Sequence, residues 1–447
     1  MPAIATNPHA AARIGDARDT RLAGQRRLST PARSMRLSVA AASLAILCPL
    51  AAQADFVEDS QLNLGLRNFY IDRDFHGDSA AISRVGSWSQ GFDLRFTSGY
   101  TEGPLQFGLD ASGQYAYRLD GGGGRGPDTI LPYDTSRGEQ VQDYGRAALT
   151  AKVRYSKTEL TIGEHRPRLP VAFFDDSRQL ASTYHGFQIA SKEIDGLSLT
   201  AGRFSEISTR ESSNHEKIYL FTRPGGPRRP SDGLNFAGGT YAFTPGLSAT
   251  YFYGQLEDIY QQHYLGLAHS TELGGGYSLK TDLRYYDNRE DGEALYGDID
   301  NRSYGLLSAL KKGGHTVTLG YQRMLGDSAF PLLNGYTPQP HLVNWSALAF
   351  FRANESSWQA RYDYDFAAMG VPGLQLMTRY IRGSGIDRGA NLSSTGESER
   401  DLYLNYVVQN GPLKGLAFGW LNIDAKFKHG SDFDENRLIT TYTWKLW

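Results

Sequence analysis

The chain has a single cysteine, Cys48, among its 447 residues. One cysteine cannot form an intramolecular disulfide, so hydrogen bonds and packing must hold the fold. Beyond the N-terminal region there is no run of eighteen apolar residues, roughly the length that a membrane-spanning helix needs. The mean hydropathy of −0.44 is typical of a soluble protein. A membrane β-barrel gives a similar value, because only alternate residues of each strand face lipid.

The N-terminus has the pattern of a secretory signal. In residues 35–54, Arg36 precedes an apolar stretch, and Ala52-Gln53-Ala54 forms a small-residue cleavage site. We therefore predict a signal peptide over residues 35–54, with cleavage after Ala54. Residues 1–34 lie upstream of this complete signal. They reflect either a start codon assigned too early or a leader extension. We expect that neither residues 1–34 nor residues 35–54 belong to the fold.

No block of basic residues remains in the predicted mature chain, residues 55–447. Residues 1–54 contain seven arginines and two aspartates, so the mature chain keeps 39 basic and 46 acidic residues. A net charge of about −7 without a basic block argues against a nucleic-acid partner. Metal ligands at a recognisable spacing are absent as well, so we expect no metal and no cofactor. The binding of calcium by a loop is left as an open alternative.

What the chain does contain is strands with one apolar face. In Gln106–Asp120 and again in Arg146–Ser156, apolar residues alternate with polar ones over about ten residues. An alternation with period two places all the apolar side chains on one side of a sheet. The 50 glycines and 27 tyrosines of the chain fit many turns and aromatic strand ends.

The connections between these strands alternate between short and long. Short turns such as Asp195-Gly196 and Gly313-Gly314 are followed by long segments such as 121–142 and 326–355. Outer-membrane barrels have tight periplasmic turns, long outer loops and an even number of strands. Tyrosine pairs near strand ends, such as Tyr115/Tyr117 and Tyr285/Tyr286, fit aromatic girdles. We therefore predict a transmembrane antiparallel β-barrel of eighteen strands. Leu342–Phe351 alternates poorly, and we assign it to a folded loop.

One segment interrupts the strand pattern. Arg166–Gly186 contains two prolines, Pro167 and Pro170, which prevent regular ladder pairing. Its apolar stem is followed by a charged tip, Asp175, Asp176, Ser177 and Arg178. We predict that this loop folds into the lumen, and that the four tip residues face its narrowest part opposite Phe330–Tyr336. An ordinary surface loop is the alternative.

The strand faces opposite the apolar ones carry more basic than acidic residues. Arginines along a lumen lower the barrier for anions and pass a carboxylate from one to the next. We expect about half of them to be paired with neighbouring acids, because like charges in a narrow lumen repel. The predicted inward basic residues are Arg67, Arg73, Arg95, Arg118, Arg146, Lys152, Arg154, Lys280, Arg284, Arg361, Arg379 and Arg437.

An ordered set of segments resembles the OprD family of outer-membrane carboxylate channels. The set includes RNFYIDRDF (67–75), PVAFFDDSRQLASTYHGF (170–187), GRFSEIS (202–208), FPLLNGYTPQP (330–340), SWQARYDYDF (357–366), GVPGL (370–374), RYIRG (379–383) and DENRLITTYTW (434–444). The resemblance covers nearly the whole mature chain.

The resemblance implies an eighteen-stranded barrel narrowed by its third loop, Pro170–Gly186, and its seventh, Gly326–Glu355. It also implies a ladder of arginines and lysines that guides carboxylates. Where the family tends to have arginines near the end of the chain, this sequence has Lys426 and Lys428. We include Lys426 in the ladder, although lysine cannot form the bidentate fork of arginine.

These patterns predict a porin of the bacterial outer membrane for the passive diffusion of small carboxylates such as amino acids or aromatic acids. Its partners would be those solutes, outer-membrane lipid and lipopolysaccharide, and it would be a monomer or a loose homotrimer. A chitooligosaccharide-type or general diffusion porin is the alternative. An outer-membrane hydrolase using His165, His185 and Ser177 is a weaker one, because no G-x-S-x-G motif surrounds Ser177. We expect a channel and no enzyme.

Overall fold

The computed structural model describes residues 56–447, except 78–79, 81, 223–225 and 390–391. The predicted extension 1–34 and signal peptide 35–54 lie outside the described residues. In the described part of the chain, no helix combines the length and the apolarity that a membrane crossing requires. The helical segments of the described residues are a single turn at 56–58 and the short 3-10 helix η1, Phe366–Met369.

One antiparallel sheet dominates the structure. It holds nineteen strands in the described part, and one of these, β12 (Glu216–Lys217), is a two-residue strand in a loop, which leaves eighteen long strands. The long strands are β1 (Gln61–His76), β2 (Arg84–Thr97), β3 (Leu105–Asp120), β6 (Asp143–Tyr155), β7 (Thr158–His165), β10 (Thr183–Ser191), β11 (Leu197–Ser208), β13 (Leu234–Thr244), β14 (Leu247–Leu256), β15 (Tyr260–Gly274), β16 (Tyr277–Glu290), β17 (Asp300–Lys312), β18 (His315–Leu325), β19 (Ser356–Asp365), β20 (Leu374–Ile386), β21 (Thr395–Val407), β22 (Ala417–Phe427) and β23 (Asp432–Lys445).

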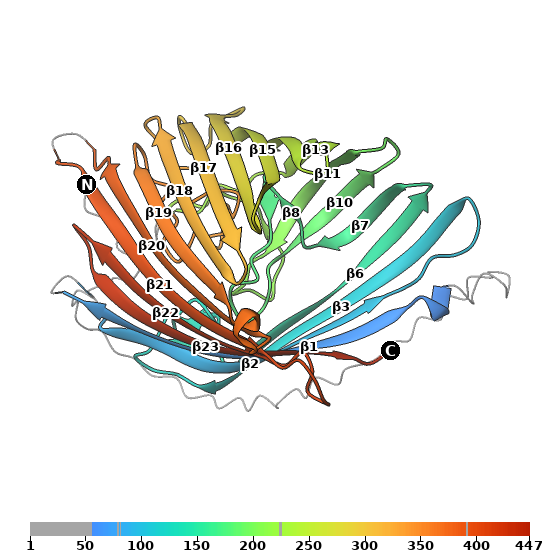
Figure 1. Ribbon diagram of the computed structural model, residues 1–447, viewed down its shortest axis with the longest axis horizontal. Helices are drawn as coiled ribbons and strands as arrows, with labels where there is room; N and C mark the ends of the chain where they lie inside the picture. The colour runs from blue at the N-terminus through green and yellow to red at the C-terminus, as the bar shows by residue number, and fades with distance from the viewer. Residues whose placement is uncertain (1–55, 78–79, 81, 223–225, 390–391) are drawn as a thin grey trace, which may run out of the picture.

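The sheet closes on itself. Each long strand pairs with its neighbours along the chain, and β1 pairs with β23 from Asn63↔Lys445 to His76↔Asp432. Figure 1 shows this closure, with the first strand beside the last one. Closure removes the free edges that an open sheet would expose to lipid. The predicted barrel of eighteen strands is confirmed.

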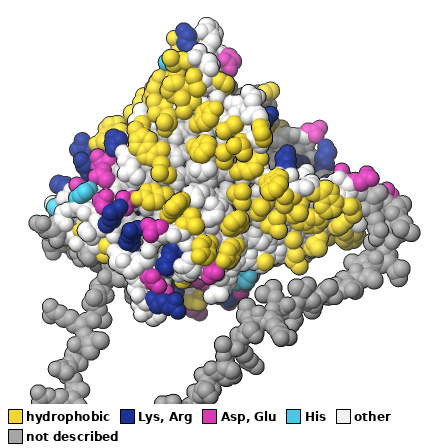
Figure 2. Space-filling model, turned by 90° about the horizontal axis from the view of Figure 1, so that it is seen from below, with side chains coloured by type: hydrophobic (Ala, Val, Ile, Leu, Met, Phe, Trp, Pro, Cys, Tyr) yellow, Lys and Arg dark blue, Asp and Glu magenta, His cyan; other side chains and the backbone are white. Residues whose placement is uncertain are grey.

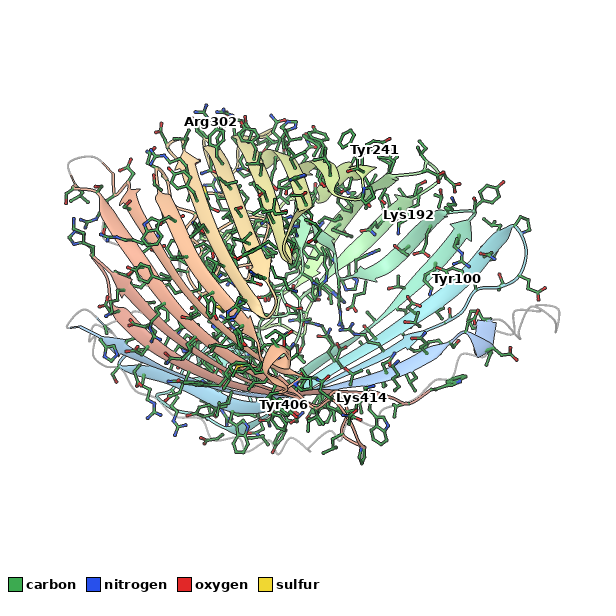
Figure 3. All side chains as sticks on the ribbon, in the orientation of Figure 1. Tyr100, Lys192, Tyr241, Arg302, Tyr406 and Lys414 are labelled. Carbon is green, nitrogen blue, oxygen red and sulfur yellow. The ribbon has the colours of Figure 1, made fainter. Side chains whose placement is uncertain are left out.

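The two ends of the barrel differ in their connections. Short turns join the strands at the end that holds the start of β1 and the C-terminus, and Tyr100, Lys192, Tyr241 and Tyr406 lie around this end in Figure 3. The outer end carries long loops, including 121–142, 166–182, 209–233 and 326–355. The predicted strict alternation in length is wrong at two places, because the outer connections 257–259 and 428–431 are also short.

The outer wall is apolar over most of its height. Leu149 is 62% exposed and Ile162 is 52% exposed, and both project away from the lumen. Figure 2 shows hydrophobic side chains across one side of the wall, with the charged side chains mostly at the margins of this apolar field. Tyr115 and Tyr117 are exposed on the outside as predicted, whereas Tyr286 is 1% exposed and turns inward.

Loops fill the outer half of the barrel. A hydrophobic core joins inward side chains of β11 to β16 with apolar residues of three loops, including Phe174, Leu220 and Phe330. The segment Leu342–Phe351 forms no strand and packs inside, as predicted from its poor alternation. The small hairpins β4 (Tyr133–Asp134) with β5 (Glu139–Gln140), and β8 (Arg168–Leu169) with β9 (Ala172–Phe173), stiffen two of the loops.

The ladder between β6 and β7 is interrupted. Pairing ends at Thr150↔Gly163, although β6 continues to Asp143. Gly163 has φ +135°, and a Cβ there would lie 2.2 Å from the carbonyl oxygen of Leu149. Only glycine allows this approach. β7 continues for two more residues, Glu164 and His165, which pair with β10 but not with β6. Above this point, the loop 209–233 lies against β6, where the backbone N–H of Gly145 donates to Ser213 Oγ at 3.3 Å.

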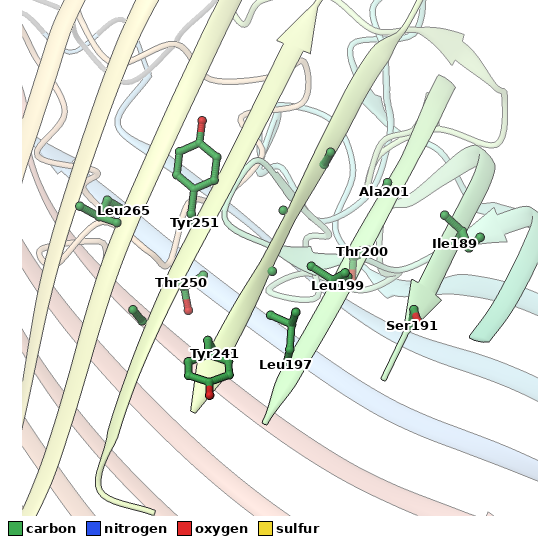
Figure 4. Close-up of a pocket in the computed structure, with 14 residues that line it drawn as sticks. Ile189, Ser191, Leu197, Leu199, Thr200, Ala201, Tyr241, Thr250, Tyr251 and Leu265 are labelled. Carbon is green, nitrogen blue, oxygen red and sulfur yellow. The ribbon is translucent and has the colours of Figure 1, made fainter. Parts of the chain in front are cut away.

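The wall also carries a groove of about 670 Å³ on β10 to β15. Its sides are formed by Leu199, Tyr241, Tyr251 and Leu265, which Figure 4 shows over a floor of smaller residues. Leu199, Tyr241, Tyr251 and Leu265 are all exposed, so the groove opens on the apolar outside and not on the lumen.

Candidate functional site

The third outer loop, residues 166–182, folds into the barrel because its stem is apolar. Val171, Ala172 and Phe174 are at most 5% exposed and belong to the core shared with the other loops. The hydroxyl of Tyr184 donates to the carbonyl of Phe173 at 3.0 Å and secures the stem. This stem holds the charged tip inside the barrel.

Asp175 at the tip does not line the lumen. Its carboxylate is 2% exposed and forms an ion pair of 2.6 Å with Arg210 of the fourth outer loop, residues 209–233. Burial alone would raise the pKa of Asp175, but Arg210 and Arg178 outweigh it and hold that pKa below its usual range. This corrects the prediction that all four tip residues face the lumen. The sequence could not reveal it, because the partner is on another loop.

The other tip residues behave differently from one another. Asp176 and Ser177 are exposed, whereas Arg178 is 9% exposed. The guanidinium of Arg178 donates to the hydroxyl of Ser177 at 3.0 Å and to Thr129 at 3.3 Å. Burial, together with Arg210 and Arg437, lowers the pKa of Arg178.

Arg67 of β1 fixes the tip to the wall. Its guanidinium donates to the carbonyl of Asp176 at 2.7 Å and to the carbonyl of Arg178. In return, the side-chain amide of Gln179 donates to the carbonyl of Arg67 at 2.9 Å. Charge-assisted bonds of this kind are stronger than neutral ones. They set the position of Asp176 relative to β1.

The seventh outer loop, residues 326–355, meets the third loop from the opposite side. The side-chain amide of Gln339 donates to the carbonyl of Pro170 at 2.7 Å, and His341 packs edge-on against Phe173 at 6.2 Å. The predicted meeting segment Phe330–Tyr336 reaches the tip only at its end, where Tyr336 lines a hollow together with Asp176 and Arg178. Within that segment, Leu333 forms a β-bridge with Leu220 of the fourth loop. The sequence did not predict that the fourth loop forms part of the lining of the site.

Acidic residues of β21 anchor the seventh loop. The carboxylate of Glu399 accepts the backbone N–H groups of Ala347 at 3.1 Å and Leu348 at 2.6 Å. Asp401 pairs with Arg379 at 2.6 Å, and the same arginine donates to the carbonyl of Trp345 at 3.3 Å. Arg379 and Asp401 thus support the loop as well as facing the lumen.

Two hollows meet at Arg67 and Asp176, which line both of them. The first, of about 480 Å³, lies between the third and seventh loops and the wall of β20 to β23, and it is also lined by Arg178, Arg210, Arg379, Asp401 and Arg437. The second, of about 530 Å³, reaches toward Gln61 and Lys445 at the end that holds the start of β1 and the C-terminus, and it is also lined by Asp93, Arg95 and Arg168. Basic side chains outnumber acidic ones in each.

Most of the predicted inward basic residues have an acidic partner. Eight of the twelve are paired, more than the half that we expected, so their charge is partly neutralised. The pairs are Arg73 with Glu435, Arg95 with Asp93, Arg118 with Glu139, Lys152 with Asp110, Lys280 with Asp282, Arg361 with Asp363, Arg379 with Asp401 and Arg437 with Glu435.

The other four, Arg67, Arg146, Arg154 and Arg284, form no ion pair among the described residues. Arg146 donates instead to loop carbonyls, including those of Thr209 at 2.8 Å and Ser212 at 2.7 Å, and lines neither hollow. Arg154 stacks on Tyr100 at 3.8 Å, and Arg284 donates to the carbonyl of Pro340 at 3.0 Å. Only Arg67 of these four lines the two hollows.

Lys426 does not face the lumen. It lies on β22 between Ala425 and Phe427, and Ala425 is 0% exposed in an internal core. Lys426 itself is 63% exposed, and its amine lies 3.6 Å from Asp424 on the outer wall. Near the outer end, loops pack the inside of the barrel while the outside is polar, so the usual rule for the two strand faces is reversed.

Sequence reasoning also missed basic residues of the loops. Arg166 pairs with Asp93 at 2.8 Å, and Arg168 is 67% exposed and stacks on Phe174 at 4.8 Å. The signal was present in the segment RPRLP, whose arginines flank the prolines. No strand periodicity applies there, so their direction was not predictable.

The chain matches the family described as outer membrane porin, OprD family, over residues 54–446. The chain belongs to this family. It is 40% identical over 408 residues to the porin-like protein GalP of Pseudomonas putida, which covers 90% of this chain and 97% of that protein. The resemblance found in the sequence is therefore confirmed.

Solved structures of OprD-family relatives superpose over most of the chain. The crystal structure of Pseudomonas aeruginosa OpdL is 49% identical, with a TM-score of 0.78 over 88% of this chain and 100% of that chain. P. aeruginosa OpdK, solved with vanillate, is 37% identical, with a TM-score of 0.81 over 87% of this chain and 100% of that chain. The OprD-family barrel is thus a channel of the bacterial outer membrane through which small solutes pass.

Proposed function

We propose that this OprD-family porin admits small carboxylate-bearing solutes by passive diffusion past Arg67 and Asp176. The supporting observation is that these two side chains line both hollows, so a solute that moves from one hollow to the other passes them. Around them, each hollow has more basic than acidic residues. A carboxylate would exchange one guanidinium for the next, and the acids would keep each contact weak enough for release.

The relative solved with vanillate, an aromatic carboxylate, supports the same chemical class. A hydrolase is a weaker candidate. The hydroxyl of Ser177 accepts from Arg178, while the ring of His165 lies against Phe204 at 5.1 Å and near the carbonyl of Gly186. A nucleophile needs an adjacent base, and none of these contacts joins Ser177 to His165. We therefore propose a channel without catalytic activity.

The test removes two exposed basic residues of the second hollow. In Arg95→Gln combined with Arg168→Gln, the side chains lost are 52% and 67% exposed. Asp93 remains paired with Arg166, whereas the exposed carboxylate of Asp176 loses its 3.6 Å ion pair with Arg168. We expect liposome uptake of benzoate to slow by about fivefold, since each exposed charge contributes about 0.5 kcal/mol. Uptake of a neutral sugar of similar size should not change.

The matched control removes two cations of the outer wall, Lys312, which stacks on Tyr277 at 4.1 Å, and Arg84, which pairs with Asp72. This double glutamine variant should transport benzoate like the wild type. Equal slowing of benzoate and sugar by the Arg95/Arg168 variant would instead identify a general diffusion porin. A preference for chitooligosaccharides over benzoate would identify the sugar-selective alternative.

A further inference from the structure

Four basic side chains gather on the outer wall where β20, β21 and β22 approach the outer end. They are Arg382, Arg400, Lys426 and Lys428, called here the rim cluster. The register places Arg382 opposite Ser398, and Ser398 opposite Lys426, so one row crosses three strands. Arg400 lies in the adjacent row, opposite Tyr380 and Asp424. Four cations thus share one small area.

The rim cluster points away from the lumen. The strand neighbours Ile381, Glu399 and Ala425 are each 0% exposed on the inner side. Because successive side chains of a strand alternate between faces, Arg382, Arg400 and Lys426 must project outward. All four members of the cluster are exposed. None of them can serve the solute pathway.

The positive charge of the rim cluster is largely uncompensated. In the described part of the chain, Asp424, at 3.6 Å from Lys426, is the one acidic residue that forms an ion pair with the cluster, and Arg400 donates to the amide oxygen of Asn422 at 2.7 Å. Among the described residues, Arg382 and Lys428 have no ion pair. The nearby carboxylate of Glu397 is 2% exposed and pairs with Arg352 at 3.1 Å.

Several other outward basic residues of the same end are neutralised. Arg84 pairs with Asp72 at 2.6 Å, and Arg289 pairs with Asp287 at 2.9 Å and with Asp300 at 2.6 Å. The rim cluster therefore differs from its surroundings in charge balance and not merely in the presence of basic residues. Its surplus charge calls for an external anion.

The surroundings of the cluster fit a lipid anion. A groove of about 460 Å³ is lined by Arg382, Lys426 and Lys428 together with the hydroxyl-bearing Ser394 and Ser398. Beside it, the exposed rings of Trp358 and Tyr380 pack at 5.6 Å. Aromatic residues of membrane barrels mark the boundary between headgroups and acyl chains.

The wall continues from this boundary toward the membrane interior with exposed apolar side chains. Leu404, Trp420 and Leu438 are 37%, 38% and 52% exposed on β21, β22 and β23. The rim cluster is therefore at headgroup height, and the apolar residues are at acyl-chain height. A ligand with anionic groups above and hydrocarbon chains below matches both parts.

We propose that the rim cluster binds the phosphate groups of a phosphorylated lipid of the outer leaflet, whose acyl chains lie along β21 to β23. Arg382 and Lys426 approach the phosphate from either side of Ser398, while Lys428 and Arg400 add charge. This site is separate from the solute pathway. It gives the barrel a defined lipid neighbour on one side.

The test titrates the purified full-length protein in detergent with lipid A that carries two phosphates, and counts bound lipid by native mass spectrometry. We expect the combined variant Arg382→Gln, Lys426→Gln and Lys428→Gln to weaken binding by at least about tenfold, because three charge-assisted contacts are lost. Wild-type protein should bind dephosphorylated lipid A with an affinity that is lower than its affinity for bisphosphorylated lipid A by a similar factor. Circular dichroism checks that each variant keeps its β-structure.

The matched control is Arg84→Gln, Arg289→Gln and Arg302→Gln, which removes the same charge from paired residues of the same end. Its affinity for bisphosphorylated lipid A should stay within about twofold of wild type. Equal weakening by both triple variants would overturn the proposal in favour of general charge attraction. The proposal would also be overturned if the wild-type protein bound dephosphorylated lipid A, or inorganic phosphate alone, as tightly as bisphosphorylated lipid A.

Discussion

At the scale of single residues, the buried pair Asp175–Arg210 holds the third and fourth loops together. The two side chains are 2% and 6% exposed and lie 2.6 Å apart. Breaking a buried pair from one side leaves an uncompensated charge and costs about 3–5 kcal/mol. We expect Asp175→Asn to loosen the loop tip, which single-channel recording would show as a raised and noisier conductance. The double variant Asp175→Leu with Arg210→Met should show less conductance noise than Asp175→Asn, because it leaves no unpaired charge of this pair buried.

Acidification should reproduce part of this effect. Because the folded-state pKa of Asp175 lies below its usual value, its ionised form stabilises the loop above the unfolded value of about 3.9. That stability is lost as pH falls through the lower folded-state pKa. Conductance should stay level from about pH 7 to 5 and rise at pH below about 4. Asp175→Asn should lack this rise, and an equal rise in both proteins would assign it to other groups.

Strand periodicity predicted the inward direction of Arg67, Arg95, Arg379 and Arg437, because a two-residue repeat reports on faces. It could not predict their partners, since Arg379 and Asp401 belong to different strands and Asp175 and Arg210 to different loops. Lys426 was misplaced for another reason. The apolar face marks the outside only where lipid is outside, and near the outer end the packed loops are the apolar environment.

At the scale of elements, the third loop narrows the channel by placing its tip between the two hollows. Deleting Phe173–Arg178 removes Asp176 from that boundary and takes away both carbonyl acceptors of Arg67. We expect the single-channel conductance to rise severalfold. Deleting the exposed hairpin tip Thr135–Arg137 is the control and should leave conductance unchanged. A third-loop deletion with normal conductance would mean that the restriction lies elsewhere.

The turn residues and loop lengths explain why the elements were predictable. Tight turns such as Asp195-Gly196 separate strands with clean alternation, so the strand count followed from the sequence. The inner arrangement of the loops did not follow. Contacts such as Gln339 to Pro170 and Leu333 to Leu220 join residues more than a hundred positions apart, and no local pattern encodes them.

At the scale of the whole molecule, closure of the sheet between β1 and β23 can be tested by a disulfide. Asn68 and Thr440 are register partners across this pair. Opposite residues of an antiparallel pair have Cα atoms about 4.5–5.5 Å apart, within disulfide range. We expect Asn68→Cys with Thr440→Cys to form an intramolecular disulfide on mild oxidation, seen as faster migration on a non-reducing gel after heating.

The chain suits this experiment because Cys48, its single cysteine, lies in the predicted signal peptide. Asn68→Cys with Thr281→Cys, which places the second cysteine on β16, is the control and should not cross-link within one molecule. Failure of the Asn68/Thr440 pair to cross-link in a folded sample would mean an open sheet.

The interrupted ladder between β6 and β7 is a line of mechanical weakness in the barrel wall. Six residue pairs join these strands, against fourteen between β1 and β2. Under lateral stress, the wall should tear first along the upper half of β6, where Arg146 and Gly145 replace a ladder with isolated bonds to the fourth loop. A barrel of this kind would thus begin to unfold from its side rather than from its ends.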